Sequence, residues 1–293
     1  MTPTTATAAA AAQSMRIAFV INNAAFFVSH RLPIARGARD AGHDVMLLTG
    51  EAGSVTMEAS AVDTLQSHGI DHRAVAFRSA GVNPLHEARG LVGLVAGLRK
   101  FRPDVVHCAS PKGILYGGIA ARLVGVRSLV LAVSGMGFLF TGASSGWRAR
   151  LARVYLALAR FVYRHPNKRV IVQNRDDWQS LQAGGFATPS ELVLIPGSGV
   201  CLEHYAGIDD GARADIVLLP ARMLRDKGVA EFVAAARQLR AAGCGWRFVL
   251  VGTADYQNPT TVPADTIRGW VDEGVVEWWG HRDDMPAVFA QAR

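Results

Sequence analysis

Short runs of β-branched and aliphatic residues alternate along the chain with longer segments in which apolar residues recur every three or four positions. The runs predict strands at Arg16–Ile21, Val45–Thr49, Val105–His107, Ser128–Val133, Arg169–Val172 and Leu192–Ile195. The longer segments predict helices, among them Leu32–Ala41, His86–Arg99 and Trp147–Arg164. Strands that alternate with helices form parallel sheets covered on both faces, so the sequence predicts an α/β fold.

The pattern restarts after the Gly- and Ser-rich residues 197–199. Strands are predicted at Asp215–Leu219, Trp246–Val251 and Val275–Trp279, and a helix at Gly228–Ala242. We expect two Rossmann-like domains, residues 15–200 and 201–293, after a disordered leader at residues 1–14. Three strands cannot bury both faces of such a sheet, so the second domain is expected to be incomplete and the chain inactive and marginally stable.

Composition and charge narrow the class of protein. Half of the 293 residues are hydrophobic, and the three cysteines are widely separated, which favours a reducing cytoplasm over a disulfide framework or a zinc site. Residues 1–200 hold 21 Lys or Arg against 11 Asp or Glu, whereas residues 201–293 hold 10 against 13. The basic half is expected to face nucleic acid, a membrane surface or a diphosphate. The uncharged stretch Ser128–Trp147 is rich in Gly and Ser, which favours a strand and loop over a transmembrane helix.

One phosphate-binding candidate lies in the second half. Arg222 and Lys227 flank a tight loop between a predicted strand and the helix that contains Phe232. A helix N-terminus favours anions, a guanidinium adds paired hydrogen bonds and an ammonium adds a point charge, which together suit a diphosphate. The alternative is that both residues are solvated loop cations.

Two candidate segments follow the first predicted strand. Asn22 and Asn23 begin a loop that lacks the GxGxxG dinucleotide fingerprint; they could line a cleft or form a plain turn. The segment Ser29-His30-Arg31, just before Pro33, could offer a cation to an anionic acceptor or simply start a helix.

Two more candidates follow later strands. Ser134, Gly135 and Gly137 allow a ligand to approach the backbone, although a tight turn would look the same. His107, at the end of its strand, is a candidate polar contact, but a structural histidine is the favoured alternative because no partner carboxylate is identifiable.

The predicted helix 147–164 carries a basic stripe. Arg150, Arg153, Arg160 and Arg164 fall on one side, and aromatic and aliphatic residues cover much of the other. This arrangement suits an anionic membrane interface, and a solvated face on a core-packed helix is the alternative.

Several collinear motifs resemble retaining glycosyltransferases of family 4, in the branch that builds capsule, O-antigen or other lipid-linked glycans. They are Ser134-Gly135-Met136-Gly137-Phe138, Gln173-Asn174-Arg175-Asp176-Asp177, Ile195-Pro196-Gly197-Ser198-Gly199, Ala221-Arg222 with Lys227-Gly228, and Trp279-Gly280-His281-Arg282. The resemblance runs from Met15 to Arg293 in the expected order. Cys201 departs from it, because the family usually has Asp there, and the paired glutamates of a later helix are absent.

The resemblance implies a GT-B fold, in which the N-terminal domain takes a lipid-linked glycan acceptor and the C-terminal domain a nucleotide-sugar. Arg222 and Lys227 would stabilise the departing diphosphate, with no cofactor or metal. Gly252, Thr253, His281 and Arg282 are the expected donor-binding residues, and Asn22, Asn23, His30, His107, Ser134, Gly135 and Gly137 are expected at the acceptor or cleft. The implied location is the cytoplasm, peripheral to the inner face of the plasma membrane.

Two other functions stay open. One is a nucleotide-sugar 2-epimerase, which the Gly-Met-Gly and Gln-Asn-Arg-Asp-Asp segments argue against. The other is a truncated, catalytically incompetent nucleotide-binding remnant. Nucleic-acid binding is not expected, because the sequence shows no zinc finger, RRM-type motif or basic reading helix.

Overall fold

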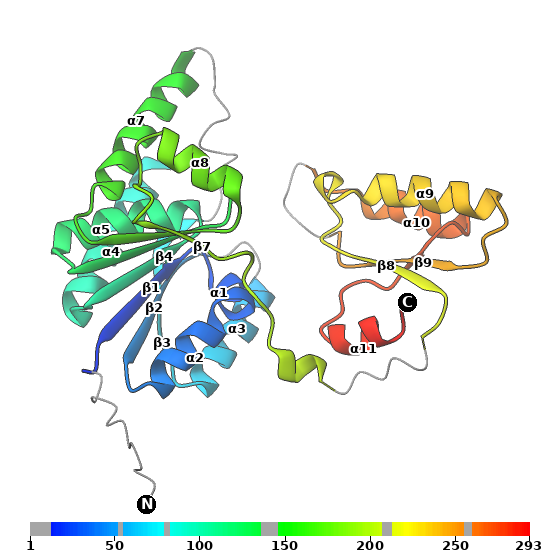
Figure 1. The fold of residues 1–293 in the computed structure, drawn as a ribbon, viewed down its shortest axis with the longest axis horizontal. Coiled ribbons are helices and arrows are strands. Elements are labelled where there is room, and N and C mark those ends of the chain that lie inside the picture. The colour runs from blue at the N-terminus through cyan, green and yellow to red at the C-terminus, as the bar shows by residue number, and fades with distance from the viewer. Residues whose placement is uncertain (1–12, 52–54, 79–82, 136–145, 207–212, 255–259) are drawn as a thin grey trace, which may run out of the picture. The chain divides into compact units, whose positions relative to one another are not determined.

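The protein was analysed as a computed structural model, which describes residues 13–51, 55–78, 83–135, 146–206, 213–254 and 260–293. The chain divides into two compact units, residues 1–199 and 200–293, each with its own sheet and hydrophobic core (Figure 1).

The first unit is built on a parallel sheet of seven strands. In chain order these are β1 (Arg16–Ile21), β2 (Asp44–Glu51), β3 (Asp71–Arg78), β4 (Val105–Ala109), β5 (Ser128–Val133), β6 (Lys168–Val172) and β7 (Leu192–Leu194). Their order across the sheet is β3-β2-β1-β4-β5-β6-β7, and every neighbouring pair is parallel. The order therefore reverses between β1 and β4, and such a switch point is the place at which open α/β sheets bind ligands.

Helices cover both faces of this sheet, as Figure 1 shows. One group consists of α1 (Ala24–His30), α2 (Leu32–Asp40) and α3 (Val55–Ser67). The other consists of α4 (Pro84–Phe101), α5 (Gly118–Val124), α7 (Gly146–Tyr163) and α8 (Arg175–Ala183), with a π-helical turn η1 (Gly113–Gly117) leading into α5. Alternate residues of β1 face the two layers: Phe19 and Ile21 join the core with Phe27 of α1, whereas Val20 joins the core with Leu94 of α4.

Close packing holds α7 against α5 and the sheet. A Cβ atom at Gly118 would lie 2.3 Å from Cγ1 of Val162, and one at Gly117 would lie 2.8 Å from Cγ1 of Val20. These positions need glycine because side chains would collide there, and the approach fixes the line along which α7 crosses the layer.

The second unit has a smaller parallel sheet. Among its described residues the strands are β8 (Ile216–Pro220), β9 (Arg247–Val251) and β10 (Glu277–Trp278), in the order β10-β9-β8. Helices α9 (Val229–Ala241) and α10 (Ala264–Asp272) pack around Phe248 and Leu250, and α11 (Met285–Ala290) brings Val288 against Val249 of β9. The predicted strand Val275–Trp279 is shorter in the structure, because only residues 277–278 pair with β9.

Candidate functional site

The loop after β8 holds its backbone in place with two buried apolar residues. Met223 is fully buried, Leu224 is 2% exposed, and the Met223 amide donates to the carbonyl oxygen of Thr253 over 3.3 Å. Leu224 also forms an isolated bridge with Thr261. Arg222 and Lys227 are both exposed, so the loop presents its cations to solvent from a fixed backbone.

This loop leads directly into α9. A 3-10 turn, η4 (Arg225–Lys227), ends at Gly228, whose φ of +74° lies in the left-handed region that glycine adopts most readily. Helix α9 is 13 residues long, so its first turn offers N–H groups and a partial positive charge beside Lys227. The arrangement can bind an oxyanion, which is the chemistry predicted for Arg222 and Lys227.

Gly252, an expected donor-binding residue, lies where three loops meet. Its φ is +146°, and an added Cβ would lie 1.9 Å from the carbonyl oxygen of Ala221. The Gly252 amide donates to the Gly280 carbonyl over 2.7 Å, and the Trp278 indole donates to the Gly252 carbonyl, also over 2.7 Å. Packing therefore accounts for a glycine at this position, whatever it binds.

The other expected donor residues differ in their surroundings. Thr253 is half-buried and follows Gly252 directly. Exposed His281 lies 3.0 Å from the carboxylate of Asp283, and the Arg282 guanidinium donates to Asp284 over 2.7 Å, which raises the pKa of Arg282. The charge of Arg282 is thus already compensated within its own loop.

In the first unit, the ends of β1 and β4 are joined by side chains. The Ser110 hydroxyl donates to the side-chain Oδ1 of Asn22 over 2.6 Å and accepts from the backbone N–H of Asn22 at 3.2 Å. Ser110 adopts a φ of +68°, unusual for a residue other than glycine, and such strain concentrates at functional sites. Sequence reasoning missed Ser110, since a lone serine after a strand carries no pattern.

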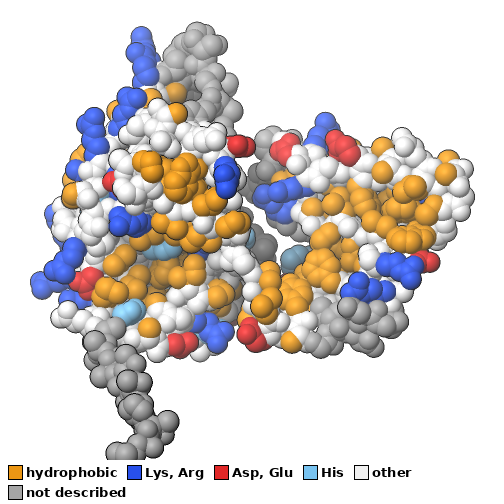
Figure 2. Space-filling model, viewed as in Figure 1, with side chains coloured by type: hydrophobic (Ala, Val, Ile, Leu, Met, Phe, Trp, Pro, Cys, Tyr) orange, Lys and Arg blue, Asp and Glu red, His pale blue; other side chains and the backbone are white. Residues whose placement is uncertain are grey.

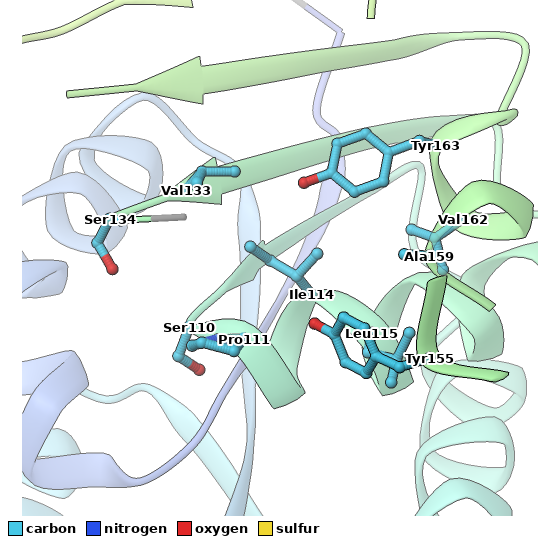
Figure 3. A pocket seen from close by; sticks show the side chains of 11 residues that line it. Ser110, Pro111, Ile114, Leu115, Val133, Ser134, Tyr155, Ala159, Val162 and Tyr163 are labelled. Atoms are coloured by element: carbon cyan, nitrogen blue, oxygen red, sulfur yellow. The ribbon is translucent and has the colours of Figure 1, made fainter. Parts of the chain in front are cut away.

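Ser110 also borders a cavity of about 30 Å³ at the carboxyl ends of β4 and β5 (Figure 3). Ser134 and Gly135 also line this cavity, whereas Gly137 lies outside the described residues. Tyr155 and Tyr163 of α7 point their hydroxyl groups toward the strand ends. Burial raises the pKa of Tyr155 to about 12 and that of Tyr163 further, so both phenols keep their protons at neutral pH.

The prediction of a loop at residues 22–27 is wrong, because α1 begins at Ala24. Asn23 caps this helix: its Oδ1 accepts from the Phe26 amide at 2.8 Å. Glu58 of α3 accepts from the amides of Ala24 and Ala25 at 2.8 and 3.2 Å. A carboxylate thus occupies the position where phosphate would bind in a dinucleotide site, which agrees with the missing fingerprint.

His30 lies against an aromatic ring at a helix end. It ends α1 and stacks on Phe26 with ring centroids 4.2 Å apart. Burial and the charge of Arg31 lower the pKa of His30, although a hydrogen bond from Nδ1 to the Phe26 carbonyl oxygen acts in the opposite direction, so the surroundings disfavour the cationic ring.

His107 lies inside β4, which continues to Ala109, rather than at the end of its strand. It stacks on Phe19, its register partner in β1, with ring centroids 5.1 Å apart. Burial, together with the charge of Arg31, lowers the pKa of His107 to about 4. The side chain is 8% exposed, and its Nε2 is buried without a hydrogen-bond partner.

The four arginines of the predicted stripe all lie at the surface. Arg150, Arg153 and Arg160 are exposed on α7, and Arg164 follows directly after it. The apolar side of this helix is only partly buried: Val162 is buried, whereas the side chains of Val154 and Leu158 are 57% and 38% exposed.

In the described ranges, no three His, Cys, Asp or Glu residues lie close enough to hold a metal ion. No described helix has the length and apolar composition needed to span a bilayer.

A family model described as "Glycosyl transferase 4-like" matches residues 16–167, more than half of the chain. This chain belongs to that family. The glycosyltransferase family predicted from the sequence motifs is therefore confirmed.

A curated relative of this family member is the N,N'-diacetylbacillosaminyl-diphospho-undecaprenol alpha-1,3-N-acetylgalactosaminyltransferase of Campylobacter jejuni. It is 23% identical over 285 residues, which cover 92% of this chain and 71% of the relative. The chain therefore spans about seven-tenths of that relative's length.

Solved structures confirm the predicted GT-B fold. Alr3699/HepE of Anabaena, in complex with UDP and glucose, matches with a TM-score of 0.64 and 18% identity, over 95% of this chain and 72% of that one. The UDP-GlcNAc 2-epimerase of Methanocaldococcus jannaschii matches with a TM-score of 0.57 and 10% identity, over 94% and 76%. Because transferases and epimerases share this fold, the fold alone does not separate the two activities.

Proposed function

We propose that this protein transfers a sugar from a nucleotide-sugar donor to a glycan carried on a polyprenyl diphosphate, with retention of configuration at the anomeric carbon. The observation that carries the proposal is the loop after β8, where Arg222 and Lys227 are exposed on a backbone fixed by Met223 and Leu224. Membership of the glycosyl transferase 4-like family supports the reaction class. The name of the Campylobacter relative supports the acceptor class.

Sugar transfer from a nucleotide-sugar leaves a diphosphate whose negative charge grows as the glycosidic bond breaks. Arg222 can hold two of its oxygens, Lys227 adds a compact charge, and the first turn of α9 adds N–H donors. Donors preorganised in this way stabilise the transition state more than the ground state, and that difference accelerates transfer. In this proposal the protein's own cations do this work, and no metal or cofactor takes part.

We assign binding of the acceptor to the first unit. The Asn22–Ser110 pair and Ser134 place hydroxyl and amide groups at the carboxyl ends of β1, β4 and β5. These are the hydrogen-bonding groups that sugar hydroxyls need, and sheet ends of this type are where α/β proteins bind ligands.

We assign the outer surface of α4, α5 and α7 to an anionic membrane. These helices hold eight Arg or Lys residues and one acidic residue, Glu87, which pairs with Lys112 at 2.7 Å. Apolar side chains are exposed between the cations: Val92, Leu123, Val154 and Phe161 have exposed fractions of 69%, 56%, 57% and 38%. Figure 2 shows the cations along the edge of the first unit with hydrophobic side chains among them. Basic and apolar groups on one surface favour an anionic lipid interface.

The donor assignment is tested with Arg222→Ala and Lys227→Ala, each assayed for nucleoside-diphosphate binding and for sugar transfer. Loss of one such contact costs about 3 kcal/mol in the transition state, so transfer should slow on the order of 100-fold. Arg237→Ala is the matched control, because Arg237 lies on α9 but pairs with Glu273 on the surface. Unchanged transfer in both loop variants refutes the assignment. Conversion of the donor without any acceptor identifies an epimerase instead.

The membrane assignment is tested by sedimentation with vesicles containing an anionic phospholipid. Replacing Arg150, Arg153, Arg160 and Arg164 by Gln should weaken binding, since each basic residue near such a surface contributes about 1 kcal/mol, and raised salt should weaken it further. Replacing Arg237 and Arg268 of the second unit by Gln is the control. Wild-type protein that stays in the supernatant contradicts the assignment.

A further inference from the structure

Arg31 is a buried cation for which the described part of the chain holds no counter-ion. It lies in the turn between α1 and α2, is 7% exposed, and its Nε is buried without a hydrogen-bond partner. Burial alone lowers the pKa of Arg31, and no carboxylate among the described residues acts against that shift. The guanidinium therefore carries its charge at a site where the described residues supply no carboxylate partner.

Two other buried or nearly buried cations of this unit are paired. Lys168, 6% exposed, lies 2.6 Å from the carboxylate of Glu191. Lys112, 17% exposed, lies 2.7 Å from that of Glu87. Buried charges are costly unless they are paired, which is why proteins place a carboxylate beside them. Arg31 has no such carboxylate partner among the described residues.

His107 is a second buried polar group without a hydrogen-bond partner, and the charge of Arg31 affects its pKa. Its Nε2 is buried without a partner, and the nearby charge of Arg31 helps to keep the ring neutral. In the tautomer protonated on Nε2 the neutral imidazole is a hydrogen-bond donor, and in that tautomer the sheet offers a neutral donor near the cation of Arg31. Buried donors without a hydrogen-bond partner are rare, and each calls for an explanation, such as a ligand that supplies the partner.

We propose that Arg31 and His107 together bind a phosphate-type oxyanion, and that this anion is the diphosphate of the lipid-linked acceptor. The identity of the anion rests on the proposed function, in which donor and acceptor each carry a diphosphate. The donor's diphosphate is assigned to the loop of Arg222 and Lys227 in the second unit. The acceptor's diphosphate is then the anion that the first unit has to recognise.

The test uses the full chain carrying Arg222→Ala and Lys227→Ala, so that the second unit no longer competes for the probe. Inorganic pyrophosphate is added, and amide hydrogen exchange is followed in residues 24–40 and 105–110. Pyrophosphate should slow exchange in both segments. Arg31→Met should weaken pyrophosphate binding at least tenfold, and without pyrophosphate it should leave exchange unchanged or slower, because the uncompensated charge is gone. Arg36→Met, at an exposed position of α2, should behave like the parent chain.

Arg31→Lys serves as a second variant that keeps the charge but loses the planar fork, and it should bind pyrophosphate with intermediate affinity. Two results overturn the proposal: exchange that ignores millimolar pyrophosphate in the parent chain, or equal protection in Arg31→Met. Farnesyl diphosphate and UDP then separate the two sources. Protection of residues 24–40 by farnesyl diphosphate supports an acceptor site, and protection by UDP alone overturns the assignment to the acceptor. If the protein transfers no sugar but Arg31→Met still abolishes pyrophosphate binding, the anion site is upheld and the proposed function fails.

Discussion

Protonation of His107 should destabilise the first unit at mildly acidic pH. The pKa of this ring is about 4 in the folded protein, against about 6.5 in an unfolded chain. The unfolded state therefore binds more protons between these values, and stability must fall as pH drops from about 6.5 toward 4. Each pKa unit corresponds to about 1.4 kcal/mol, so the loss attributable to His107 is about 2 kcal/mol at pH 5 and at most about 3 kcal/mol below pH 4.

The assay compares the wild type with His107→Phe, which keeps an aromatic ring against Phe19. The free energy of unfolding of the first unit is measured by hydrogen exchange at pH 7, 6 and 5. Other groups also titrate, so the informative quantity is the difference between the two proteins, which should change by about 2 kcal/mol from pH 7 to pH 5. Arg31→Met should shrink that change, because the charge of Arg31 helps to lower the pKa. Parallel stability curves for wild type and His107→Phe refute the reasoning.

Two further variants test the local packing. Gly252→Ala should destabilise the second unit by about 2–4 kcal/mol in urea denaturation, because its Cβ would overlap the Ala221 carbonyl at a φ of +146°; Gly243→Ala, also at positive φ but with no atom within 4 Å, should cost less. Glu58→Gln should weaken two charge-assisted hydrogen bonds to the start of α1 and cost about 1–2 kcal/mol; slower exchange at Ala24 and Ala25 in that variant would contradict the capping role.

Sequence patterns located most of the sheet because buried parallel strands are apolar runs. Strand β1 has the predicted bounds Arg16–Ile21, and β5 the predicted bounds Ser128–Val133. Strand β3, with the sequence Asp-His-Arg-Ala-Val-Ala-Phe-Arg, escaped detection because it is the edge strand and carries polar residues that read as a loop. Helix α1 was missed because its seven residues are too few for periodicity to register.

The same limit applies to the candidate site: residues within one local pattern can be predicted from the sequence, and roles that depend on distant segments cannot. Arg222 and Lys227 were found because strand, loop and helix signals surround them within ten residues. Arg31 comes from one segment and His107 and Ser110 from another, and their roles depend on burial and partners that no local pattern encodes. The capping carboxylate of Glu58 lies 34 residues from the amide that it binds, beyond the reach of any local motif.

The central claim is that this protein transfers a sugar to a lipid-linked acceptor by using the cationic loop of Arg222 and Lys227. The most direct measurement also tests the expectation from the sequence that the chain is inactive. It incubates the protein with a panel of radiolabelled nucleotide-sugars and a synthetic polyprenyl-diphosphate saccharide, with EDTA present, and extracts the lipid product. Label should appear in the lipid phase with one donor, fall on the order of 100-fold with Arg222→Ala, and remain with Arg237→Ala. Failure of every donor to label the lipid, or equal labelling by Arg222→Ala, would contradict the account.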